Sequence, residues 1–153
     1  MVAKGRVESL NLVRLILKFV MGKHAVTGDL SQFYNSLKLR EDCFNLQCFL
    51  WKMNLGDMEE TLQAVIVTLM YGVKSVSAQS EEAMIRLAKD FQAMNPALAE
   101  LLLTGRYVDD MAASKAMLEK LKQLVRDNEV VFKKVNISCK GWTFDGEDPH
   151  KEV

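Results

Sequence analysis

The sequence contains few prolines, few cysteines and no excess of charge of either sign. Among its 153 residues are two prolines and three cysteines, and 20 Lys and Arg balance 20 Asp and Glu. So little proline favours a chain of helices and strands, because proline interrupts both. The cysteines, Cys43, Cys48 and Cys139, lack the spacing of a metal site, so we expect reduced thiols in an intracellular protein. A net charge of zero gives no support to nucleic-acid binding by bulk attraction, although a local basic groove is compatible with it.

The sequence also lacks a long apolar run. The most apolar stretch, residues 10–20, is interrupted by Arg14 and Lys18. It is shorter than the roughly 20 residues that a membrane-spanning helix needs. No small-residue cleavage site follows it, so a secretory signal is not indicated. We expect an amphipathic helix here and no membrane partner.

The composition, 49% hydrophobic and 26% charged, is that of a globular domain with a core. Residue spacing predicts a mixed order of elements. In chain order these are a helix over 7–20, a strand over 24–30, a helical turn over 31–37, strands over 44–51 and 62–70, helices over 75–93 and 96–103, a hairpin over 105–113, a helix over 114–128 capped by Ser114, a strand or continued helix over 130–137, and a polar tail from 141. This order predicts an α+β fold, with helices on one face of a mostly antiparallel sheet.

Three aspartates follow apolar strands: Asp29, Asp109 and Asp110. A carboxylate at the end of a buried strand is costly unless it is paired or bound to a cation. Mg²⁺ prefers a few carboxylates together with substrate phosphates, and two such ions are a standard device for phosphoryl transfer. The alternative is that Asp29 caps the turn over 31–35 and that Asp109 and Asp110 only form a β-turn.

Motifs around these aspartates resemble those of reverse transcriptases. Residues 107–110 read YVDD, which resembles the YxDD signature, and residues 28–37 (GDLSQFYNSL) are similar to the first palm motif. Residues 71–79 (YGVKSVSAQ) are similar to the FGLxSSP-type motif, although Val76 and Ser77 replace its Ser-Pro. Residues 140–149 (KGWTFDGEDP) are similar to the KGW-x-x-SG segment of Pao/BEL-type retrotransposon polymerases, with Asp145 in place of the usual serine. Residues 49–51 (FLW) fit the same group.

The resemblance implies the palm of a reverse transcriptase with part of the fingers. Residues 1–153 would form one partial domain of a retrotransposon polyprotein, with the upstream fingers, thumb and ribonuclease H outside it. The implied activity is RNA-directed DNA polymerisation on a primed RNA or DNA template, in the cytoplasm, a virus-like particle or the nucleus. Two alternatives stay open: an inactive retroelement relic that at most binds nucleic acid, and an unrelated α+β domain with an accidental YVDD. We expect weak, salt-sensitive duplex binding and no measurable extension by this chain alone.

The resemblance also implies a metal site. Asp29 and Asp109 would bind two Mg²⁺ ions, for which Mn²⁺ could substitute, with Asp110 as the neighbouring third carboxylate. The backbone carbonyl of Leu30 would be a further ligand.

Substrate contacts are implied at three more positions. The ring of Tyr34 would exclude the 2′-hydroxyl of the incoming nucleotide and so select dNTPs. Gly72 would let the backbone approach the nascent base pair. Lys140 would protonate the leaving pyrophosphate or neutralise its charge, or else be an ordinary solvated lysine.

Overall fold

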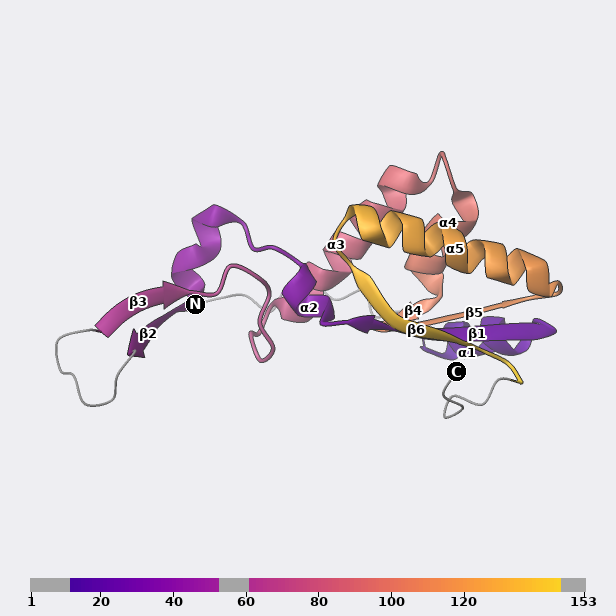
Figure 1. The fold of residues 1–153 in the computed structure, drawn as a ribbon, viewed down its shortest axis with the longest axis horizontal. Helices are drawn as coiled ribbons and strands as arrows, with labels where there is room; N and C mark the ends of the chain where they lie inside the picture. The colour runs from indigo at the N-terminus through magenta and orange to yellow at the C-terminus, as the bar shows by residue number, and fades with distance from the viewer. Residues whose placement is uncertain (1–11, 53–60, 147–153) are drawn as a thin grey trace.

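The computed structural model describes residues 12–52 and 61–146 (Figure 1). Its elements are α1 (Leu12–Val20), β1 (His24–Ser31), α2 (Phe33–Ser36), the 3₁₀ helix η1 (Glu41–Gln47), β2 (Cys48–Lys52), β3 (Thr61–Val65), α3 (Val76–Phe91), α4 (Pro96–Thr104), β4 (Arg106–Tyr107), β5 (Asp110–Lys115), α5 (Leu118–Lys134) and β6 (Ser138–Phe144). The main sheet has the antiparallel order β4-β5-β1-β6, and β2 and β3 form a separate hairpin. Figure 1 shows α3, α4 and α5 together on one side of the main sheet. This confirms the α+β class, an antiparallel sheet backed by helices.

Strand β1 lies inside the main sheet, between β5 and β6. Its buried residues alternate with more exposed ones, as expected for a strand with one face against the core. Val26 and Leu30 are both 1% exposed. Val26 packs with Leu121 and Val125 of α5, while Leu30 belongs to a larger cluster with residues of α2, α3 and α4. The two clusters together fix the helices over the strand that carries Asp29.

Two of the expected strands have different boundaries. The strand expected over 44–51 begins only at Cys48, because Glu41–Gln47 forms a 3₁₀ helix. The strand expected over 62–70 ends at Val65, and the chain beyond it pairs instead with the segment after α2. Leu39 donates its amide to the Val67 carbonyl, and Leu69 donates to the Leu37 carbonyl.

The C-terminal part corrects three further expectations. Helix α5 begins at Leu118, not at Ser114, and continues to Lys134, so the first half of 130–137 is helical. Ser114 lies in β5 and caps no helix of its own. Residues Ser138–Phe144 form the edge strand β6 where a polar tail was expected. The part of that tail after residue 146, like the start of the helix expected over 7–20, lies outside the described residues.

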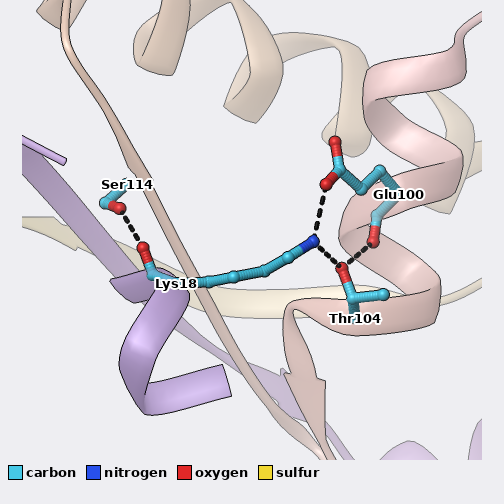
Figure 2. A network of polar contacts seen from close by, with 4 residues as sticks. All are labelled: Lys18, Glu100, Thr104 and Ser114. Carbon is cyan, nitrogen blue, oxygen red and sulfur yellow. Dashed lines mark hydrogen bonds and ion pairs between the residues drawn. The ribbon is translucent and has the colours of Figure 1, made fainter. Parts of the chain in front are cut away.

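Helix α1 is attached to helix α4 and to strand β5 by polar contacts (Figure 2). Lys18 Nζ donates to Glu100 Oε1 at 2.6 Å and to Thr104 Oγ1 at 3.1 Å. The Ser114 hydroxyl donates to the Lys18 carbonyl at 2.8 Å. No residue of α1 is fully buried, and several of its apolar side chains are exposed: Leu12, Val13, Ile16, Leu17 and Val20.

The described residues contain neither a membrane-spanning helix nor a disulfide. None of the helices found there is long and apolar enough to cross a bilayer. The three cysteines, all within the described ranges, are free, as the sequence predicts.

Candidate active site

The three sequence-predicted aspartates meet at one end of the main sheet. In the antiparallel pairing of β1 with β5, Asp29 lies opposite Asp110. The amide of Leu30 donates to the carbonyl of Asp109 at 2.9 Å, which ties the β4–β5 turn to β1. Residues that are 80 positions apart in the sequence are therefore joined by backbone contacts.

An irregularity in the pairing of β1 with β6 places Lys140 beside Asp29. On its other side β1 pairs with β6, and the register shifts between Gly28, opposite Trp142, and Leu30, opposite Cys139. Lys140 and Gly141 thus both lie opposite the single residue Asp29. Bulges of this kind redirect a side chain and are common next to active sites.

Lys140 forms an ion pair with Asp29. Its Nζ lies 2.7 Å from Asp29 Oδ2, although 61% of the lysine side chain stays exposed. The hydrogen bond to Asp29, followed by the negative charge of that residue, raises the pKa of Lys140 above its ordinary value. Lys140 is therefore a paired charge at the acidic site and not an isolated solvated lysine.

Repulsion among the carboxylates is visible at Asp110. Partial burial raises the pKa of Asp110 above its ordinary value, and the charges of Asp109 and Asp29 raise it further. Lys140 acts in the opposite direction. A cation placed among these carboxylates would offset the repulsion that they now exert on one another.

One oxygen of the site, Asp29 Oδ1, is suited to bind a hard divalent cation. Asp29 Oδ1 is buried and has no hydrogen-bond partner, although Oδ2 of the same carboxylate is paired with Lys140. An unpaired buried carboxylate oxygen is costly, and carboxylate oxygens are the ligands that Mg²⁺ prefers. Within residues 12–52 and 61–146, however, no three His, Cys, Asp or Glu side chains are grouped closely enough to hold a metal as they stand. Asp29 is the best candidate ligand, and a metal would need Asp109 or Asp110 to turn toward it.

Tyr34 lies on α2, directly after β1. It is only 7% exposed, and its ring meets the ring of Tyr71 edge-on at a centroid distance of 4.6 Å. Its neighbour Phe33 is fully buried. Leu30 is buried as well, so its side chain is part of the core. Tyr71 was expected only as part of a motif, and its contact with Tyr34 links that motif to the end of β1.

Gly72 adopts a left-handed backbone, with φ of +86°. Apart from its two chain neighbours, no atom of residues 12–52 and 61–146 lies within 4 Å of the position that a Cβ would take there. The glycine is thus required by the turn itself.

Two residues near the YVDD turn were missed in the sequence. Arg106 is 1% exposed and hydrogen-bonded to Val108 and Glu81. Neighbouring side chains of a strand point to opposite faces, but the residue types gave no signal that the arginine would be the buried one. The neighbouring Tyr107, which begins the YVDD motif, is 45% exposed.

Comparison with known proteins adds no relative. No protein-family model matches the chain, and no curated protein matches it significantly. The similarity to reverse transcriptases therefore rests on the motifs and stays a prediction.

Proposed function

We propose that this chain is the palm of a reverse transcriptase, an RNA-directed DNA polymerase of the Pao/BEL retrotransposon type. The observation that carries the proposal is the β1–β5 register, in which Asp29 lies opposite Asp110 while Lys140 reaches Asp29 from β6. Three motif segments far apart in the sequence thus contribute charged groups to one end of one sheet. An accidental YVDD would not require the other motifs to lie beside it.

The reaction proposed is nucleotidyl transfer. The 3′-oxygen of a primer attacks the α-phosphorus of a dNTP, a new P–O bond forms, and the bond to pyrophosphate breaks. Asp29 and Asp109 would hold two Mg²⁺ ions, with Asp110 and the Leu30 carbonyl beside them. When bound, such ions lower the pKa of the attacking hydroxyl and stabilise the leaving oxygen. The protein otherwise contributes positioning and electrostatics, as in other phosphoryl transfers.

The other residues have substrate roles in this proposal. The ammonium of Lys140, already near Asp29, would neutralise or protonate the leaving pyrophosphate. The ring of Tyr34, held against Tyr71, would exclude a 2′-hydroxyl. Gly72 would leave room for the nascent base pair.

Metal binding gives the first test. Mn²⁺ titration of the chain, followed by water-proton relaxation, should show a site that Asp29→Asn and Asp109→Asn each weaken about tenfold or more, because each removes a charged ligand. Glu119→Gln, on the exposed first turn of α5, is the matched control and should leave the affinity unchanged. Mn²⁺ binding that is insensitive to both aspartates would contradict the proposal.

A primer-extension assay gives the second test. Templated dNTP incorporation on RNA with Mg²⁺, lost in Asp109→Asn, would establish the activity and overturn the expectation that this chain alone is inactive. Duplex binding without any aspartate-dependent Mn²⁺ site would favour the alternative, an inactive nucleic-acid-binding module.

A further inference from the structure

The buried residue Arg106 touches two segments of the candidate site. Its Nη1 donates to the Val108 carbonyl at 2.6 Å, inside the turn that carries Asp109. Its guanidinium carbon lies 5.8 Å from the centroid of the Phe33 ring, at the start of α2, which carries Tyr34. That distance is within the range of a cation–π contact.

Glu81 of α3 holds the same guanidinium. Its Oε2 accepts from Arg106 Nη2 at 2.6 Å, and the Glu81 side chain is only 16% exposed. A planar guanidinium has several donors at fixed angles, so it can bind a carboxylate and a main-chain carbonyl together. A lysine offers only one donor nitrogen, so it could not reach the two acceptors through separate nitrogens as Nη1 and Nη2 do.

The buried Arg106–Glu81 ion pair is not explained by its contribution to stability. Arg106 Nε is buried without a partner, and burying an ion pair is often no better for stability than packing apolar side chains. The carbonyl that Arg106 binds belongs to Val108, a β-branched residue with a left-handed φ of +57°. A residue type that rarely adopts this backbone is thus held there by a buried charge.

We propose that the Arg106–Glu81 pair positions the β4–β5 turn, and thereby sets Asp109 against Asp29. The metal-binding part of this inference rests on the proposed function. Arg106 is in this view a positioning residue, since it reaches the candidate ligands only through the backbone of Val108. The contact with Phe33 couples the same device to the segment that carries Tyr34.

The test separates loss of the docked turn from loss of global stability, because Leu30 protection is compared with the free energy of unfolding of the same variant. The Leu30 amide bonds the Asp109 carbonyl, so its hydrogen exchange, measured by NMR, reports whether the turn is docked on β1. Arg106→Gln should lower Leu30 protection and weaken Mn²⁺ binding about tenfold, as loss of an outer partner of a metal ligand commonly does. Leu121→Ala, a cavity variant in the separate cluster under α5, is the control. It should lower the melting temperature, reduce Leu30 protection by no more than its loss in free energy of unfolding, and leave Mn²⁺ binding unchanged.

A second variant keeps the proposal falsifiable if Arg106→Gln fails to fold. The double variant Arg106→Gln/Glu81→Gln removes both charges, so no unpaired charge is left buried. We expect it to fold and to lose Leu30 protection as the single variant does. Wild-type Leu30 protection in a folded variant would overturn the proposal.

Failure of the proposed function is distinguishable from failure of this inference. If wild-type protein shows no Asp109-dependent Mn²⁺ site, the polymerase proposal fails. Leu30 exchange then decides the positioning role by itself: lost protection supports it, and unchanged protection rejects it.

Discussion

At the residue scale, two residues of the YVDD turn are in unfavourable states, one in its backbone conformation and one in its charge. Val108 has a left-handed backbone. Partial burial and the neighbouring negative charges raise the pKa of Asp110. Such features persist where the surroundings impose them, and they concentrate at functional sites. The sequence contains the turn signal, because aspartates favour turns, but it does not contain the buried arginine contact that fixes the turn's geometry.

We predict that Val108→Gly stabilises the protein. A left-handed conformation costs a non-glycine residue about 1–2 kcal/mol. Replacing the valine by glycine removes this cost, but about 0.5–1 kcal/mol is lost again because glycine gives up more conformational freedom on folding. Since Val108 is 38% exposed, little burial is lost, and the free energy of unfolding in urea should rise by up to about 1 kcal/mol. Val67→Gly, at a position without a left-handed φ, should lower it. A lower value for Val108→Gly than for wild type would show that the turn is not strained.

A second prediction concerns Tyr34. If its ring excludes the 2′-hydroxyl, Tyr34→Val should reduce the preference for dATP over ATP in Mn²⁺-dependent binding, measured by calorimetry. Tyr34→Phe keeps the ring and its contact with Tyr71, so the preference should stay. Because Tyr34 is part of the core, the valine variant should also melt at a lower temperature. Equal preference for dATP in the valine variant and wild type would show that Tyr34 is not the gate.

At the element scale, the helices follow from local signals and the strands only in part. Helix α4 begins where the sequence predicts, with Pro96 in its first turn and the Asn95 side chain accepting from the Leu98 amide. The edge strand β6 was not expected, because its first half (Ser-Cys-Lys-Gly) has low strand propensity and is held mainly by pairing with β1. The Lys140–Asp29 contact depends on that strand. Its geometry could therefore not be derived from local sequence.

The attachment of α1 gives a pH-dependent prediction. The hydrogen bond from Lys18 holds the pKa of Glu100 below its ordinary value. Stability from this pair is therefore present above the ordinary glutamate pKa, and it is lost as the pH falls through the lowered value. An exposed pair of this kind contributes about 0.2–1 kcal/mol.

Lys18→Met should remove this contribution at pH 7 and change little at pH 3. Hydrogen exchange of α1 amides, together with thermal unfolding at both values, measures the effect. Arg86→Met breaks the comparable exposed pair with Glu82 within α3 and should leave α1 exchange unchanged. An equal effect of Lys18→Met at both pH values would indicate that the methylenes of the lysine, and not its charge, hold the helix.

At the scale of the whole molecule, the fold class is readable from the sequence but the topology is not. The order of helices and strands predicts an α+β domain, because segments of both periodicities alternate along the chain. Which strands become neighbours depends on side-chain packing between distant segments. The aspartates converge because β1 lies between β5 and β6, and this placement has no local signal in the residues of β1.

The central position of β1 also has a consequence for biosynthesis. Strand β1, at residues 24–31, is made well before its two partners, which begin only at residues 110 and 138. A ribosome adds roughly 5–20 residues per second. During several seconds of translation, β1 has neither neighbour, and both of its edges are open to other chains. Helices α3 and α4 contact each other and follow one another directly, so they can pair during that interval. The candidate active site is thus assembled only after α3 and α4 have been made.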